Sequence, residues 1–211
     1  MEHIDDFYAP FETVTSELKI KRSLFIAQIS PCGRSEDFRG ILTEVGRLHK
    51  EANHHCWAYR LAPGADGQED VSHCSDDGEP AGTAGKPILS AIRQGGLFCA
   101  CVVVTRYFGG IKLGVRGLID AYAEAGKTVV NLSGRVLKTR AKKLAVRLPY
   151  AAIKEATHAI TSCGAVGSPV WSYEAEVSLT AEVRASFAPQ AEKALDELAN
   201  RGLIRSWGWV T

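Results

Sequence analysis

Apolar residues in the first part of the chain alternate between the period of a strand and that of a helix. A two-residue period over 14–20 and an apolar stretch over 24–29 predict two strands, joined as a hairpin at residues 21–23. Helical spacing of apolar residues follows over 36–48, and a further strand is expected at 55–61. The sequence therefore begins as a mixture of strands and helices.

Two more helices and a buried strand are expected before residue 134. An amphipathic helix begins near Ile88 and ends at Gly95, because glycine commonly terminates helices. The most apolar run, 97–104, predicts a strand buried on both faces. Over 115–132 the apolar residues line one helical face, so this helix is expected to pack on the sheet.

After Gly134 a new succession of strand and helix periods in the apolar residues begins, and it predicts a second domain. Strands are expected at 144–148, 165–171, 175–181 and 203–210, with helices at 153–163 and from Pro189 to Gly202. The resulting order, βαββαβ, is the ferredoxin-like arrangement. We therefore expect an α+β protein with one domain over residues 1–136 and a ferredoxin-like domain over 137–211.

Composition and charge narrow the possible partners. The chain has 211 residues, 45% of them hydrophobic, which suits an ordinary globular protein. Its net charge of +1 argues against binding nucleic acid by overall electrostatics, so only a local basic patch could do so. The longest apolar run is shorter than the roughly 18 residues of a membrane span. We expect a cytoplasmic protein with reduced cysteines and no membrane partner; the oligomeric state is open.

Two irregular stretches carry the candidate chemistry. Residues 75–87 combine three carboxylates, three glycines, two prolines and one lysine, with no hydrophobic period. Residues 105–117 form a second glycine-rich stretch directly after the most apolar run. Glycine permits unusual backbone angles and proline removes a backbone donor, so both stretches are expected to be shaped loops. We expect the two loops to be neighbours in the fold.

Together with residues 54–60, these stretches resemble the signature of the YigZ/IMPACT family. The resemblance extends over nearly the whole chain, starts at 21–27, and is most specific at 76–80 and 85–87. Residues 115–117, Val-Arg-Gly, depart from it, since family members often have glycine or threonine-glycine there.

The resemblance implies a cytosolic two-domain protein associated with translation. Its N-terminal domain would be a two-layer α/β sandwich of the ribosomal-protein second-domain-like type, as in domain four of elongation factor G, with one helical layer on a mixed sheet. The resemblance implies no particular reaction, and we favour a regulator that binds RNA, the ribosome or a ribosome-associated protein without catalysis, through the loops at 75–87 and 105–117 and the basic residues that follow Gly134.

An enzyme is the alternative. Asp76, Asp77 and Glu79 could serve as ligands or bases in a metal-assisted hydrolase acting on a phosphorylated or nucleotide substrate. The same carboxylates could instead cap turns and the following helix. The sequence shows no serine or cysteine nucleophile with an identifiable histidine base and acidic partner. We therefore expect no catalytic residue and no cofactor.

An anion or RNA site is expected where the second glycine-rich stretch meets its helix. The backbone amides from Gly114 to Gly117 lie at the start of that helix, where the helix dipole favours an anion. We expect Lys86, Arg106, Lys112 and Arg116 to converge there. The glycines would serve equally for tight packing of the helix on the strand, and this alternative stays open.

A basic run at the domain junction is the second candidate for phosphate contact. It contains six cations and no acid: Arg135, Lys138, Arg140, Lys142, Lys143 and Arg147. A solvated linker and strand face would look the same in the sequence. Trp207 and Trp209 share one strand face and could stack on bases or lie buried under helices.

The histidines and cysteines at 54–56 and 73–74 are not expected to bind a metal ion. In a strand, His54 and Cys56 face one side and His55 the other, and no paired ligand motif supports them. Neither a phosphate-binding loop nor a dinucleotide-binding turn fits the glycine spacing.

Overall fold

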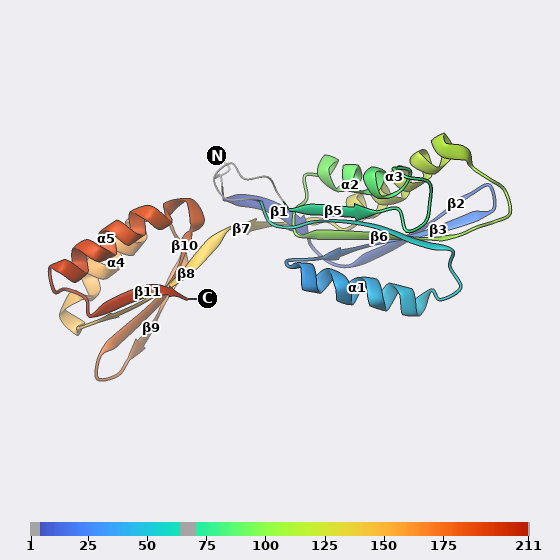
Figure 1. Cartoon of the computed structure of the whole chain (residues 1–211). Coiled ribbons are helices and arrows are strands. Elements are labelled where there is room, and N and C mark those ends of the chain that lie inside the picture. The colour runs from blue at the N-terminus through green and yellow to red at the C-terminus, as the bar shows by residue number, and fades with distance from the viewer. Residues whose placement is uncertain (1–4, 64–70, 211) are drawn as a thin grey trace. The chain divides into compact units, whose positions relative to one another are not determined.

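The computed structural model describes residues 5–63 and 71–210, and the chain divides into two compact units (Figure 1). One unit is Phe7–Lys138. The other contains the chain from Thr139 onward together with Asp5 and Asp6. The division into domains over residues 1–136 and 137–211 stays a prediction.

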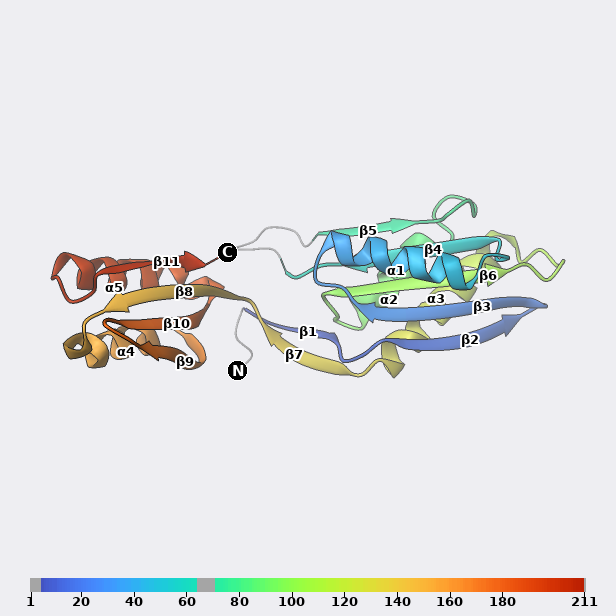
Figure 2. The same cartoon turned by 90° about the horizontal axis from the view of Figure 1, so that it is seen from below.

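A five-stranded sheet forms the centre of the first unit. Its strands, in spatial order, are β2 (Val14–Ile20), β3 (Ser23–Pro31), β6 (Ala100–Tyr107), β4 (His54–Arg60) and β5 (Ser72–Ser75). Figure 2 shows these strands from below. Each neighbouring pair runs antiparallel, so the expectation of a mixed sheet is wrong. Hydrophobic periodicity indicates which face a residue takes but not the direction of the strand that carries it.

Helices cover both faces of this sheet (Figure 1). Two of them, α2 (Gly85–Gln94) and α3 (Gly114–Leu132), form the expected helical layer. The third, α1 (Ser35–Leu48), packs on the opposite face through Phe38 and Val45. The expected single helical layer therefore omitted α1, because an amphipathic pattern does not say which side of a sheet the helix covers.

Strand β6 lies inside this arrangement and is buried on both faces, as its apolar run predicts. Val102 and Val104 point toward α2 and α3, whereas Cys101 and Val103 point toward α1. The strand begins three residues later than expected and continues to Tyr107. The sequence pattern predicts a loop for its last residues, and this difference decides the position of Arg106.

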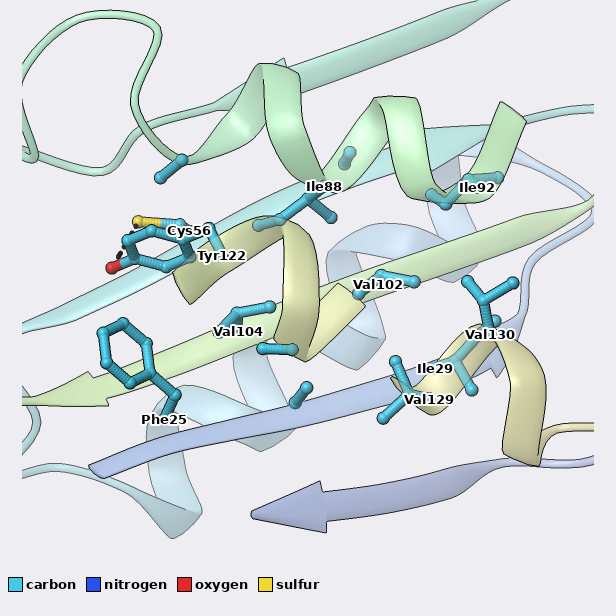
Figure 3. Packing of buried hydrophobic residues seen from close by; sticks show 14 of the residues in the cluster. Phe25, Ile29, Cys56, Ile88, Ile92, Val102, Val104, Tyr122, Val129 and Val130 are labelled. Atoms are coloured by element: carbon cyan, nitrogen blue, oxygen red, sulfur yellow. Dashed lines mark hydrogen bonds between the residues drawn. The ribbon is translucent and has the colours of Figure 1, made fainter. Parts of the chain in front are cut away.

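The core between the sheet and α3 is built around Tyr122 (Figure 3). The Tyr122 ring meets Phe25 edge to face, with ring centroids 5.2 Å apart. Ile88 of α2 and Val104 of β6 belong to the same buried cluster. Burying each large side chain of this kind stabilises a fold by about 1.5–3 kcal/mol. The hydroxyl of Tyr122 is the polar end of this apolar cluster, and it needs a partner.

Three short strands were not predicted. A two-stranded sheet pairs β1 (Asp6–Pro10) with β7 (Arg135–Thr139), and β5 is the third. Each has five residues or fewer, which is too short for a clear two-residue period.

The second unit has the expected ferredoxin-like arrangement. Its elements are β8 (Ala141–Leu148), α4 (Ile153–Ser162), β9 (Ala165–Tyr173), β10 (Val177–Arg184), α5 (Ala188–Asn200) and β11 (Ser206–Val210), with short 3-10 turns at Tyr150–Ala152 and Ala185–Phe187. The sheet order is β11-β8-β10-β9, and its neighbours are antiparallel. The α+β fold class is thus confirmed.

Trp207 and Trp209 pack on the helical side of the second sheet. Their indole N–H groups donate to Asp196 at 3.0 Å and Glu192 at 2.8 Å, both on α5. Of the two alternatives for these tryptophans, packing against a helix is therefore the one observed. Among the described residues, no helix is long and apolar enough to cross a membrane.

The hairpin between β2 and β3 gives a direct test of the packing. Its turn residues Lys21 and Arg22 both have positive φ, and a Cβ added to Gly109 would come within 2.1 Å of the Arg22 carbonyl. We expect Gly109→Ala to lower the free energy of unfolding by about 2 kcal/mol or more, because backbone atoms must move. Urea unfolding monitored by circular dichroism measures this.

Gly40→Ala is the matched control for that substitution. Gly40 lies within α1, and an added Cβ would meet nothing within 4 Å. Alanine should raise the free energy of unfolding there by about 1 kcal/mol, since glycine is a poor helix former. Equal effects of the two substitutions would show that the hairpin does not press on Gly109.

Candidate functional site

The first carboxylate of the loop at 75–87 organises the loop itself. Asp76 accepts hydrogen bonds from the backbone N–H groups of Gly82 at 2.7 Å, Ala84 at 2.9 Å and Gly85 at 2.8 Å. These groups lie at and before the start of α2, so Asp76 caps that helix. Burial acts to raise the pKa of Asp76, but these hydrogen bonds and nearby Lys86 hold the pKa below its ordinary value.

The second carboxylate fastens the loop to β4. Asp77 Oδ2 accepts the backbone N–H of His55 at 2.6 Å. The carbonyl oxygen of Asp77 lies 2.7 Å from Nδ1 of His54. Asp77 has φ of +43°, a left-handed conformation that aspartate tolerates better than most residues. Its contacts are therefore with the first residues of β4.

The third carboxylate is buried in an ion pair. Glu79 Oε1 accepts from Arg106 Nη1 at 2.6 Å and from the Tyr122 hydroxyl at 2.9 Å. His54 Nε2 lies 4.0 Å from the same oxygen. Glu79 and Arg106 are 9% and 5% exposed. One buried oxygen thus connects the loop at 75–87 to β6 and to α3.

The side-chain oxygens of the three carboxylates therefore accept hydrogen bonds from different donors. The hydrolase alternative assigns Asp76, Asp77 and Glu79 as ligands or bases, and in this structure each of these carboxylates has an internal hydrogen-bond donor. Among the described residues, no group of three histidine, cysteine or acidic side chains is placed to hold a metal ion. That the histidines and cysteines at 54–56 and 73–74 bind no metal ion stays a prediction, and elemental analysis of the purified protein tests it.

Arg106 was expected in a surface loop but is an inward-facing strand residue. Because β6 continues to Tyr107, Arg106 shares the inner face of the sheet with Val102 and Val104. Its guanidinium carbon lies 5.4 Å from the ring centroids of both Phe25 and Phe108. Its Nη2 donates weakly to Ser23 at 3.4 Å, and its Nε has no hydrogen-bond partner among the described residues.

A cavity of about 370 Å³ lies at the start of α3, beside the Glu79–Arg106 pair. Its lining consists of Glu79, Pro80, Arg106, Phe108, Lys112, Leu113, Gly114, Val115 and Leu118. The structure therefore brings three predicted anion-site residues to one cavity: Arg106, Lys112 and Gly114. Lys86, Arg116 and Gly117 are not part of the lining.

The predicted cations outside the cavity have other surroundings. Arg116 is exposed and makes an ion pair with Asp120 one turn further along α3, with Nε 3.2 Å from each carboxylate oxygen. Lys86 lies near Asp76 at the start of α2. Of the four cations expected to converge, only Arg106 and Lys112 line this cavity, and Lys86 and Arg116 do not.

The start of α3 has an unusual charge distribution. The described residues provide no side-chain cap for this helix and no acidic residue in its first turn. Lys112 and Arg116 flank the helix start instead. Cations are unfavourable next to the positive end of a helix dipole, so this end would be stabilised by an external anion.

Three cations of the basic run, Arg140, Lys142 and Lys143, have different surroundings within the second unit. Arg140 is paired with Asp5 at 3.0 Å, and Ser186 donates two further hydrogen bonds to Asp5. Burial acts to raise the pKa of Asp5, but Ser186 and Arg140 hold it below its ordinary value. Lys142 lies over Trp209, on the helical side of β8, and Lys143 faces the opposite side because strand residues alternate.

The cysteine and histidines beside the loop make contacts inside the fold. Burial raises the pKa of the Cys56 thiol to about 12, and its sulfur lies 2.9 Å from the Asp76 carbonyl oxygen and 3.3 Å from the Tyr122 hydroxyl. Burial lowers the pKa of His55, whose Nδ1 lies 3.0 Å from the Thr105 hydroxyl. A thiol with such a pKa is protonated at neutral pH and a poor nucleophile.

Sequence reasoning missed Tyr122 as a member of this site. Tyr122 is one of the apolar residues over 115–132 that the pattern places on one helical face, and it is fully buried. A buried tyrosine usually has a hydrogen-bond partner for its hydroxyl, and this requirement was the available signal. The apolar cavity residues Phe108, Leu113 and Leu118 were also missed, because the pattern does not show that α3 begins beside a hollow.

The capping role of Asp76 predicts a pH-dependent loss of stability. Asp76→Ala should lower the free energy of unfolding by about 1–2 kcal/mol at neutral pH, because three backbone donors lose their acceptor. A carboxylate whose pKa is depressed by folding stabilises above its unfolded pKa and loses that contribution as pH falls through its folded pKa. The difference between wild type and variant should therefore shrink below about pH 4.

Urea titrations between neutral and acidic pH measure this difference. Asp120→Ala is the control, because its exposed ion pair with Arg116 should contribute less than about 1 kcal/mol. A constant difference for Asp76→Ala at all pH values would contradict the capping role.

Comparison with known proteins identifies the family of this fold and site. The profile of the Impact N-terminal domain matches residues 21–130, more than half of the chain. An IMPACT family member of Haemophilus influenzae is 39% identical over 127 residues, 60% of this chain and 61% of that protein. The IMPACT family member YigZ of Escherichia coli is 37% identical over 139 residues, 66% of this chain and 65% of that protein.

A solved structure described only as that of a hypothetical protein covers almost the entire chain. It is 28% identical, covers 99% of this chain and 98% of its own, and has a TM-score of 0.67. The chain spans about three-fifths of the length of the first curated relatives it matches. The match over residues 21–130 includes the loop at 75–87, β6 and most of α3, and it shows that this chain belongs to the IMPACT family.

Proposed function

We propose that this protein is a translation-linked regulator that acts in the cytoplasm by binding the ribosome or a ribosome-associated partner, without catalysis. The link to translation comes from its membership of the IMPACT family and from what the YigZ/IMPACT resemblance implies. The proposal that it acts by binding comes from the site. One observation carries it: the carboxylates of the loop serve the fold, whereas the start of α3 presents exposed apolar and cationic side chains.

The engaged carboxylates favour a binding protein over a hydrolase. Asp76 caps α2, Asp77 accepts a backbone hydrogen bond from the start of β4, and Glu79 neutralises Arg106. A general base or metal ligand needs a free oxygen directed at the substrate or ion. In each carboxylate at least one oxygen accepts hydrogen bonds from internal donors, and among the described residues no group of three histidine, cysteine or acidic side chains could hold a metal ion.

The exposed residues beside them have the composition of an interaction surface. We call residues 108–116 the α3 rim. Within it Phe108 is 45% exposed, Ile111 42% and Val115 61%. Large apolar side chains that cluster at the surface commonly mark a site of protein interaction, and Lys112 and Arg116 add positive charge. A patch of this kind suits a binding surface for a macromolecule.

Ribosomal RNA is one possible binding surface on the ribosome. Lys112, Arg116 and the free amides of α3 would then contact phosphate groups. The net charge of +1 means that such contacts would be local. Binding to isolated ribosomal RNA is therefore worth measuring beside binding to whole ribosomes.

Substitution of the two rim cations tests the proposed function. Purified wild-type protein should co-sediment with ribosomes from its own cells through a sucrose cushion. Lys112→Ala/Arg116→Ala should weaken this binding by about tenfold, which corresponds to 1.4 kcal/mol. Lys127→Ala is the matched control, because Lys127 is an exposed cation of the same helix outside the α3 rim.

Two outcomes would contradict this proposal. One is wild-type protein that stays in the supernatant at physiological salt, and the other is equal binding by wild type and double variant. If isolated ribosomal RNA also binds, the slope of its salt dependence should fall by about one unit for each phosphate group that the double variant no longer neutralises.

A further inference from the structure

The cavity at the start of α3 is hydrophobic on most of its sides. Phe108, Leu113, Val115 and Leu118 supply its walls together with Pro80. Its volume of about 370 Å³ lies within the range of pockets that hold small ligands or single anchoring side chains. Such a cavity favours an apolar group.

The charged residues around the cavity favour a negatively charged partner. Glu79 is the acidic residue in the lining, and Arg106 neutralises it. Lys112 is exposed at the cavity edge, and Arg116 follows it in the first turn of α3. Asp120 pairs with Arg116 and offsets part of that charge. Lys112 and the positive end of α3 remain as the sources of attraction for an anion.

Arg106 adds an independent indication that the site is incomplete in the isolated chain. Its side chain is 94% buried and lines the cavity, yet its Nε–H has no acceptor among the described residues. A buried donor without an acceptor costs about 1–3 kcal/mol. The neighbouring Phe108 ring is itself 45% exposed. A ligand oxygen entering beside that ring would supply the missing acceptor.

We infer that this cavity is a docking site for an acidic peptide segment of a partner protein. One large apolar side chain of the segment enters between Phe108 and Val115, and flanking carboxylates meet Lys112 and the free amides at the start of α3. This inference rests on the proposed function, because it names the kind of surface that the ribosome or its associated partner presents.

A peptide fits the cavity better than single-stranded RNA. Sites for single-stranded RNA stack successive bases on aromatic rings in a strongly basic groove. The lining formed by the described residues contains one aromatic ring, that of Phe108, and three aliphatic side chains besides proline. Protein interfaces instead concentrate their affinity in a few large side chains that fill apolar pockets, with charges at the edge.

A selection of short random peptides displayed on phage tests this inference. Immobilised full-length protein should enrich peptides with several acidic residues and one large apolar residue. The most enriched peptide is then labelled with fluorescein, and its dissociation constant is measured by fluorescence anisotropy. A single-stranded oligouridine of similar length serves as the RNA probe. Binding of the peptide should weaken as sodium chloride rises.

Two substitutions at the cavity should reduce peptide affinity while preserving the fold. Val115→Glu and Lys112→Glu each place a carboxylate at the start of α3, where the helix dipole favours it. Each should raise the dissociation constant by about tenfold or more. Lys127→Glu makes the same charge change on the same helix outside the cavity lining and should leave the affinity unchanged.

Specific outcomes would overturn the docking site. These are enrichment without acidic bias, no enrichment at all, equal affinity of wild type and Val115→Glu, or oligouridine binding that Val115→Glu abolishes while the peptide does not bind. Ribosome co-sedimentation that depends on the rim cations, together with any of these results, would leave the proposed function intact and remove only the peptide. Peptide binding without ribosome co-sedimentation would support the docking site and contradict the proposed function.

Discussion

The buried ion pair between Glu79 and Arg106 is the interaction on which the site depends. One carboxylate oxygen receives both the guanidinium at 2.6 Å and the Tyr122 hydroxyl at 2.9 Å. It therefore joins the loop at 75–87, the end of β6 and the middle of α3. Removing one partner of a buried pair costs about 3–5 kcal/mol, because the other charge is left uncompensated. The loop and the helix are thus fixed to one another.

This pair also determines the charge that the site presents. Because Glu79 and Arg106 neutralise each other below the surface, the polarity of the cavity edge comes from Lys112 and the uncapped start of α3. Asp76 and Asp77 act in the same direction, since both direct their charge at backbone N–H groups. What the start of α3 offers outward is therefore apolar and positive.

The sequence allowed the α+β class and the ferredoxin-like order to be predicted, because these depend on long segments with clear periods. It did not allow the position of Arg106 to be predicted. A charged residue at the end of an apolar run resembles the start of a loop, and only the continued pairing of β6 with β3 and β4 shows that it faces inward. The separate partners of Asp76, Asp77 and Glu79 were hidden for the same reason, since they depend on tertiary contacts.

Hydrogen–deuterium exchange of the full chain, with and without its ribosomes, tests most directly whether the α3 rim is the binding surface. Peptides covering residues 108–118 should exchange more slowly when ribosomes are present, because binding would cover the exposed apolar side chains and cap the free amides of α3. The buried peptides around Glu79 and Arg106 should be protected in both states. Slower exchange confined to the second unit, with residues 108–118 unchanged, would contradict the account.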